Sequence, residues 1–363
     1  MTRIMVVGGG LLGMLTAREL AVGNNQVTLI ERGEMARESS WAGGGIISPL
    51  YPWRYPDSIT SLASWSQRIY PELCDALGHS TGIDPEYTPS GFLLIAPNET
   101  GRAKQWADLY GKKLDLITRE DFYSLEPALA AAPENAIWMP DVAHVRNPRL
   151  ARALVADIQQ LGVTLLTGKP VTGLSLSREK VSGVETADAT IEADAVVVCT
   201  GAWTGQLLNK FLPTPEIHPV RGQMLLFRAK PGIISRIVLE KNRYVIPRRD
   251  GRILFGSTIE EVGFEKETTE AALKELYTIA TERFPVLKRY PVEKQWAGLR
   301  PASPGGIPYI TAHPELAGLY INAGHYRNGV VLGPASARLM ADIVTGSSPI
   351  LPAEPYTLDA IRG

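Results

Sequence analysis

The sequence predicts an α/β protein with two domains, one built on a parallel dinucleotide-binding sheet and the other on a mixed sheet. Three features of the sequence predict it. A glycine-rich turn joins a strand to a helix near the N-terminus, later strand and helix patterns can extend the same sheet, and alternating strand patterns fill the stretches between them. The length of 363 residues also favours two lobes over one.

Composition excludes several classes of protein. A formal net charge of −1 argues against a nucleic-acid surface, which needs an excess of basic residues. No apolar run approaches the roughly 20 residues of a membrane span, and the first strand pattern starts so early that no signal peptide is expected. Cys74 and Cys199 are too few for a disulfide framework or a metal cluster. We therefore expect a cytoplasmic globular protein that binds no metal.

The N-terminal unit consists of a strand, a turn, a helix and a second strand. Gly8, Gly10 and Gly13 form GxGxxG between the apolar run 4–7 and a helical pattern, and the strand 26–31 ends in Glu31. In a dinucleotide-binding unit the glycines allow a tight turn, close approach of a pyrophosphate and close packing of helix on strand, while the acid binds a ribose hydroxyl. The alternative is a glycine-rich turn in some other α/β protein.

The next stretch favours a flavin over a nicotinamide dinucleotide. "ARESSWAGGGIISP" (36–49) places Ser39 and Ser40 ahead of three glycines, where a nicotinamide-dependent dehydrogenase would begin another crossover helix. Hydroxyl groups and glycines supply donors and close backbone approach for a diphosphate and a planar ring. A solvated loop is the alternative.

The rest of the nucleotide domain lies in dispersed segments. The patterns predict a helix over 147–162, strands over 163–168 and 170–176, a buried strand within 194–203, and a strand over 319–326 that leads into an apolar helix. Val171 is placed to offer its backbone to an adenine edge. We expect the nucleotide domain to comprise 1–48, 141–205 and 305–363, and the second domain 49–140 and 206–304.

The second domain shows strand patterns over 91–97, 222–229, 243–258 and 294–300. The Asp-Gly pair in "RRDGR" predicts a tight hairpin. A sheet-rich second domain joined to a dispersed dinucleotide domain is unlike the ordinary nicotinamide-dependent dehydrogenases.

Seven blocks of the sequence resemble a known family. They are "VVGGGLLG", "ERGEMARESSWAGGGI", "TGAWTG", "PVRGQML", "RYVIPRRDGRILFGST", "WAGLRPASPGGIPYI" and "AGHYRNGVVLGPA". In this order they resemble the flavin-dependent amine oxidases of the D-amino acid oxidase and sarcosine oxidase group, the glycine oxidases most of all. The resemblance covers nearly the whole chain and implies a Rossmann-type FAD-binding domain with an α+β substrate domain.

The resemblance implies the activity as well. It implies a homotetramer that oxidises glycine, sarcosine or small D-amino acids by hydride transfer from Cα to flavin N5, giving an imine or 2-oxo acid, ammonia and hydrogen peroxide. In bacteria such an imine serves thiazole formation for thiamine. Non-covalent FAD is expected, because sarcosine oxidases attach their flavin through a cysteine in the C-terminal part and this chain has none after Cys199.

The resemblance also implies site residues. Arg300 would pair bidentately with the substrate carboxylate, Tyr244 would add a hydrogen bond, and Arg327 would lie beside them. The helix that begins near Gly329 would direct its positive end at the flavin, and no catalytic acid or base is expected. The residues implied at FAD are Gly8, Gly10, Leu11, Leu12, Gly13, Glu31, Arg32, Ser39, Ser40, Gly44, Gly45, Ile46, Val171, Tyr326, Arg327, Asn328, Gly329, Val330, Val331 and Leu332.

Structural roles stay open for several of these residues. Arg300 could be a surface arginine at a strand end, Tyr244 a packing residue, and Arg327 a turn cap or a contact to flavin alone. His325, His144 and His218 are expected to be structural.

Substrate size is open as well. Ile259 stands where the resemblance implies a pocket-lining side chain, and the segment 49–57 reads as a lid or as a surface loop. Two other functions remain: a D-amino acid dehydrogenase that passes electrons to a quinone, and a flavin subunit of a multi-chain amine dehydrogenase.

Overall fold

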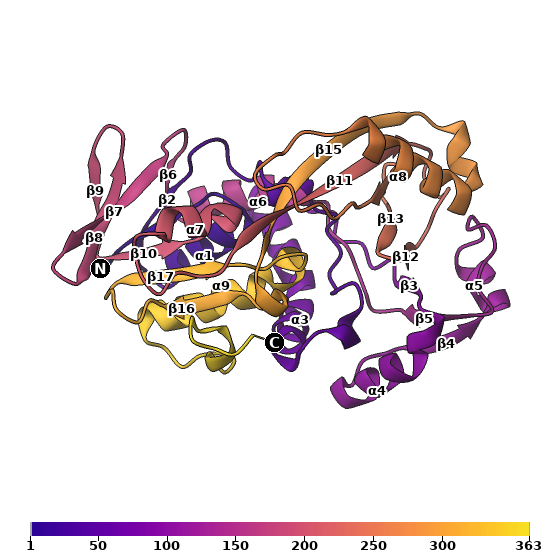
Figure 1. Ribbon diagram of the computed structural model, residues 1–363, viewed down its shortest axis with the longest axis horizontal. Coiled ribbons are helices and arrows are strands. Elements are labelled where there is room, and N and C mark those ends of the chain that lie inside the picture. Colours follow the sequence, from indigo (N-terminus) through magenta and orange to yellow (C-terminus); the bar gives the residue numbers. More distant parts are fainter. Residues whose placement is uncertain (1, 363) are drawn as a thin grey trace.

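A computed structural model describes residues 2–362 (Figure 1). Its first sheet has six strands in the order β16-β17-β10-β1-β2-β6, and all neighbours are parallel except β16 and β17. The strands are β1 (Arg3–Val7), β2 (Gln26–Ile30), β6 (Thr164–Leu166), β10 (Ala195–Val198), β16 (Tyr309–Ala312) and β17 (Leu319–Ala323). From β1 the sheet continues to β2 and β6 on one side and to β10 and β17 on the other, so the strand order reverses at β1. Open parallel sheets bind ligands at the carboxyl ends of strands at such a reversal.

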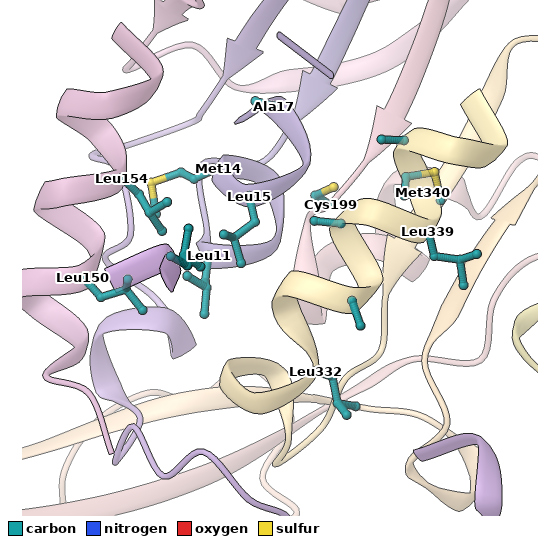
Figure 2. Packing of buried hydrophobic residues seen from close by; sticks show 14 of the residues in the cluster. Leu11, Met14, Leu15, Ala17, Leu150, Leu154, Cys199, Leu332, Leu339 and Met340 are labelled. Atoms are coloured by element: carbon teal, nitrogen blue, oxygen red, sulfur yellow. The ribbon is translucent and has the colours of Figure 1, made fainter. Parts of the chain in front are cut away.

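Both faces of this sheet are covered, which explains its continuous apolar strands. Alternate residues of β1 point to opposite sides: Ile4 and Val6 enter a core with α1 (Leu11–Val22), α6 (Asn147–Gln160), α9 (Gly329–Thr345) and α3 (Asp57–Thr81). Met5 and Val7 instead pack toward the three-stranded sheet of β7 (Val171–Ser177), β8 (Lys180–Thr186) and β9 (Thr190–Glu192). Figure 2 shows the helical side, with α1 between α6 and α9.

The second sheet has eight strands in the order β15-β11-β14-β13-β12-β3-β5-β4. They are β3 (Phe92–Ile95), β4 (Asp115–Thr118), β5 (Asn135–Met139), β11 (His218–Arg228), β12 (Ile237–Glu240), β13 (Arg243–Pro247), β14 (Arg252–Gly256) and β15 (Val292–Ala302). The helices of this part are α4 (Thr100–Tyr110), α5 (Arg119–Leu125) and α8 (Glu270–Arg283). The predicted hairpin joins β13 to β14 through Gly251, whose φ of 88° only glycine adopts readily.

The longest strands, β11 and β15, connect the two parts of the molecule. They run side by side in Figure 1 from the second sheet toward the first. Strand β15 contacts the turn η3 (Gly201–Trp203) that follows β10. Arg300, which lies near the end of β15, is thereby brought to the carboxyl end of the first sheet.

Short helical segments complete the chain. They are α2 (Ser39–Ala42), α7 (Thr204–Leu208), η1 (Pro52–Arg54), η2 (Pro97–Glu99), η4 (Pro285–Arg289), η5 (Pro304–Gly306) and η6 (Glu354–Tyr356).

The predicted fold class is confirmed. Every strand of the six-stranded sheet falls within the segments 1–48, 141–205 and 305–363, and every strand of the eight-stranded sheet falls within 49–140 and 206–304. Helix α3 belongs by sequence to the second group of segments, yet it packs on α6 and α9. The domain boundaries themselves stay a prediction.

Candidate active site

A cavity of about 460 Å³ lies between the two sheets at the carboxyl ends of β1 and β10. Side chains and backbone of both parts line it. From the predicted set these are Gly8, Gly10, Leu11, Leu12, Glu31, Arg32, Ser39, Ser40, Gly44, Gly45, Ile46, Val171, Tyr244, Arg300, Tyr326, Arg327, Gly329 and Val330. Residues predicted from distant segments are therefore brought to one cavity, whose volume lies within the usual range of ligand sites.

The N-terminal glycines allow a tight turn and leave it free of side chains. Gly8 has a φ of 110°, and a Cβ there would lie 2.6 Å from the carbonyl oxygen of Cys199. A Cβ on Gly13 would lie 1.8 Å from the carbonyl oxygen of Gly8, so α1 can pack on β1 only with a glycine at this position. Gly13 affects the turn through this packing and is not among the residues that line the cavity.

The acid at the end of β2 orders this turn from the side. The Glu31 carboxylate accepts hydrogen bonds from the backbone N–H groups of Gly9 at 2.7 Å and Gly33 at 2.9 Å. Beside it the Arg32 guanidinium lies over the Trp203 ring at 3.8 Å and pairs with Glu38. This end of the cavity therefore presents a carboxylate, a guanidinium and an aromatic ring.

The serines of the second glycine-rich stretch contact the first. The Leu11 N–H, implied to contact a pyrophosphate, donates to Ser40 Oγ at 2.7 Å. Asn147 at the start of α6 in turn donates to the Ser40 carbonyl at 2.8 Å. Ser40 thus links the N-terminus of α1 to α6.

The loop of Gly44, Gly45 and Ile46 is held by a buried arginine that sequence reasoning missed. Arg248 donates to the carbonyl oxygens of Gly44 at 2.8 Å and Val145 at 2.9 Å, and Nη1 lies 2.9 Å from His144 Nδ1. Burial lowers the pKa of Arg248 to about 10 and that of His144 well below its usual value. A neutral His144 can accept this hydrogen bond, which supports the structural role predicted for it.

The opposite end of the cavity holds two guanidinium groups and a phenol. Arg300 donates to Ser257 Oγ at 2.5 Å and to the carbonyl oxygens of Arg221 and Thr258, so it bonds only to neutral groups. Burial lowers the pKa of Arg300, Tyr244 raises it, and the nearby charge of Arg327 lowers it. The Nη2 atom of Arg327 is buried without a partner among the described residues. Two cations without an acidic partner in the part of the chain that the structure describes indicate a site for an anion.

The N-terminus of α9 closes this end. Gly329 and Val330 line the cavity, where the first amides of a helix have no intrahelical partner. Asn328, Val331 and Leu332, implied at FAD, are not among the lining residues: Leu332 donates its N–H to the Asn328 carbonyl and its side chain lies in the core shown in Figure 2. Tyr326 donates its N–H to the Pro301 carbonyl at 2.9 Å, which ties this loop to β15.

His325 lines the cavity and is buried, and burial lowers its pKa to about 3. Its Nε2 lies 2.9 Å from Ser336 Oγ on α9. A neutral, hydrogen-bonded ring fits the structural role expected of it. His218, by contrast, is exposed on β11 near Glu261.

Acid should therefore destabilise the fold through His325. The unfolded histidine takes up a proton below about pH 6.5, whereas the folded one does so only near pH 3. The free energy of unfolding is therefore unaffected by His325 above about pH 6.5 and falls as the pH drops toward 3. Urea unfolding of wild type and His325→Gln across this window should show a shallower pH slope in the variant, by up to about 1.4 kcal/mol per pH unit. Equal slopes would show that the folded histidine protonates freely.

The segment 49–57 is buried over residues 49–53, whereas Arg54, Pro56 and Asp57 are exposed. Tyr51 and Trp53 are buried, and Glu99 accepts hydrogen bonds from Trp53 and Arg54. Leu50 lines the cavity. Its role as a mobile lid stays a prediction. Ile259, expected to line the pocket, is 41% exposed and is not among the lining residues.

Several lining residues were not predicted as site residues. One group of them follows β10 or lies just before and at the start of β7: Lys169, Pro170, Thr172, Cys199, Thr200, Gly201, Ala202, Trp203, Gln206 and Leu207. The glycine turn after the buried strand in "TGAWTG" was the available signal, since such turns stand at the carboxyl end of a parallel sheet.

The residues present fit FAD. The glycines leave a cradle that any Cβ would fill, and the amides of α9 and the guanidinium groups supply donors to a polar ring system and an anion. Within residues 2–362 no group of three or more acidic, histidine or cysteine side chains is arranged to hold a metal ion. Over the same range no helix has both the length and the apolar character to cross a membrane.

Comparisons with known proteins agree with this geometry. The family model described as FAD dependent oxidoreductase matches residues 3–343. The chain is 47% identical to the glycine oxidase of Pseudomonas aeruginosa over 355 residues, 98% of each chain. It is 34% identical to the bifunctional protein ThiO/ThiG of Trichormus variabilis, covering 97% of this chain and 54% of that protein. The crystal structure of glycine oxidase from Geobacillus kaustophilus superposes with a TM-score of 0.93 at 28% identity, covering all of both chains.

Proposed function

The chain belongs to the family of FAD-dependent oxidoreductases, and we propose that it is a glycine oxidase that also accepts sarcosine and small D-amino acids. The observation that carries the proposal is the pair Arg300 and Arg327, which line one end of a dinucleotide cavity without an acidic partner among the described residues. A carboxylate is the anion that binds a guanidinium through two parallel hydrogen bonds. The relatives named glycine oxidase support the same substrate.

The cofactor is FAD, which when bound would supply a two-electron acceptor. The glycine turn, Glu31, Ser39 and Ser40 would hold its dinucleotide portion, and the loop of Gly44 and Gly45 with the start of α9 its ring system. Non-covalent binding is part of the proposal. Cys199 lines the cavity, but burial raises its pKa to about 12, so its thiol stays protonated and unreactive.

The chain contributes positioning and electrostatics. Arg300, Tyr244 and Arg327 would bind the carboxylate and fix the orientation of the substrate Cα, a gain in orientation rather than in proton transfer. The amides of Gly329 and Val330 favour negative charge that develops in the cavity. The absence of a catalytic acid or base stays a prediction: His325 is neutral, and both carboxylate oxygens of Glu31 already accept backbone hydrogen bonds.

The remaining parts of the proposal follow from the chemistry. We propose that oxygen is the electron acceptor, that oxidation gives the imine and hydrogen peroxide, and that water then hydrolyses the imine to the 2-oxo acid and ammonia. The likeness to proteins named ThiO/ThiG supports a role of the imine in thiazole formation for thiamine. A homotetramer and a cytoplasmic location stay predictions from the sequence.

The test is to mix FAD-loaded protein with glycine in the absence of oxygen and to follow its visible spectrum. Loss of the yellow absorbance is expected, followed by its return with hydrogen peroxide when air is admitted. Loss with D-alanine or D-proline but not glycine would overturn the substrate. Return with a quinone but not with air would overturn oxygen as acceptor, and failure to retain FAD would overturn the cofactor site.

A further inference from the structure

The back of the Arg300 guanidinium is fixed by three acceptors from two neighbouring segments. Nη1 donates to the carbonyl oxygens of Arg221 at 3.3 Å and Thr258 at 3.2 Å. Nη2 donates to Ser257 Oγ at 2.5 Å. Ser257 is fully buried, so water does not compete for this hydrogen bond.

These acceptors are themselves held in place. Arg221 and Glu260 exchange backbone hydrogen bonds of 2.9 and 3.0 Å, and the N–H of Gln223 donates to Thr258 Oγ1 at 2.8 Å. The Glu260 carboxylate also pairs with the Arg221 side chain and accepts from Gln223 Nε2. The segment 257–260 is therefore fastened along β11, and its oxygens cannot easily follow a guanidinium that moves.

Gly222 leaves the space that the guanidinium occupies. A Cβ at this position of β11 would lie 2.0 Å from Arg300 Nη2 and 2.3 Å from Cζ. Contacts this short are excluded, so any side chain at 222 would displace the guanidinium. The β-strand conformation gives no reason for a glycine here, since 222 is not among the positions with positive φ.

Counting donors shows what remains for a substrate. A guanidinium has five N–H donors. Both on Nη1 and one on Nη2 bond to the protein, which leaves one on Nε and one on Nη2. These two nitrogens share one edge of the planar group, whereas the edge between Nη1 and Nη2 is already used.

We propose that Arg300 binds the substrate carboxylate side-on, through Nε and Nη2, and that Ser257 and Gly222 are positioning residues that set this orientation. Ser257 is not among the residues that line the cavity, and Gly222, which does line it, acts by leaving the space that the guanidinium occupies. The inference rests on the proposed function, because it assigns a geometry to the same carboxylate site.

Two variants test it in the FAD-loaded enzyme. Ser257→Ala removes one acceptor and frees the guanidinium to turn, so the KM for glycine and the Kd of acetate, a carboxylate without an amine, should both rise about tenfold while kcat changes less than twofold, as expected for one charge-assisted hydrogen bond. Gly222→Ala should raise both values about a hundredfold or more. Acetate binding is read from the change in flavin absorbance.

Matched controls separate positioning from stability. Ser66 is, like Ser257, 0% exposed and accepts one N–H donor, that of Ala335, but it lies on α3. Ser66→Ala should lower stability to a similar extent and leave KM and the acetate Kd unchanged. Gly101→Ala, where a Cβ would meet nothing within 4 Å, is the control for Gly222→Ala.

The outcomes are distinct. If wild type does not oxidise glycine, the proposed function fails, and the acetate Kd still decides the role of Ser257. If wild type oxidises glycine but Ser257→Ala leaves both KM and the acetate Kd within twofold, the positioning role is wrong and the function stands. Should Gly222→Ala fail to fold or to retain FAD, the serine variant alone decides.

Discussion

Replacing Arg300 with methionine is expected to lower kcat/KM for glycine by a factor on the order of 10³. The guanidinium is the group proposed to pair with the substrate carboxylate, and loss of one partner of a buried, hydrogen-bonded charge pair costs about 3 to 5 kcal/mol. Methionine approximates the length of the arginine side chain and removes both the positive charge and the planar pair of N–H donors. KM should rise and kcat should fall, because a carboxylate that is not bound by the guanidinium leaves the Cα without a fixed orientation.

Steady-state oxygen consumption over a range of glycine concentrations measures this effect. Arg300→Lys should recover only part of it, since an ammonium keeps the charge but not the planar pair of donors. Arg228→Met is the control: Arg228 lies on β11, is exposed and pairs with Glu293 at the surface, so its loss should leave kcat/KM unchanged. If Arg300→Met stays within tenfold of wild type, Arg300 is not the carboxylate clamp.

Gly13→Ala is expected to destabilise the protein by about 3 kcal/mol or more and to abolish retention of FAD. A Cβ 1.8 Å from the Gly8 carbonyl oxygen and 3.4 Å from the Cys199 side chain cannot be absorbed by a rotamer change, since backbone stands in the way. Helix α1 would have to move away from β1. That movement opens the turn whose amides and glycines form the dinucleotide end of the cavity.

Chemical unfolding and the flavin content of purified protein measure the two effects. Gly78→Ala provides a matched control, because Gly78 lies within α3 at an ordinary φ and a Cβ there would meet nothing within 4 Å. The free energy of unfolding of that variant should rise by about 0.5 to 1 kcal/mol, because alanine has a higher helix propensity than glycine, and the variant should retain FAD. Wild-type stability and flavin content in Gly13→Ala would show that helix and strand need no close packing here.

Local patterns predicted the parts of the molecule that depend on local physics. The apolar strand, the glycine turn and the acid of the first thirty-one residues appear as β1, α1 and β2, and the Asp-Gly turn joins β13 to β14. A buried parallel strand needs a continuous apolar run, and a tight turn needs glycine. Such requirements are satisfied by neighbours in sequence, so they are visible in it.

The parts that were missed depend on neighbours distant in sequence. Arg248 directly follows the strand β13, and nothing near it indicates that it reaches the carbonyl oxygens of Gly44 and Val145. Gly222 has no special φ, and the glycine is explained by the Arg300 guanidinium, which a Cβ there would displace. Helix α3 lies in a stretch assigned to the second domain but packs on α6 and α9, since its apolar face is complementary to theirs.

The sequence by itself determined the fold class, the N-terminal strand–helix–strand unit and the identity of the cofactor, because apolar periodicity, glycine spacing and the seven ordered blocks are properties of the chain alone. It also singled out Arg300 and Arg327. Only the tertiary structure decided that both reach one cavity, that Val331 and Leu332 face the core instead, and that three donors of Arg300 are already bonded. Burial and hydrogen-bond partners are set by segments that meet only when the two sheets come together, and no local pattern encodes them.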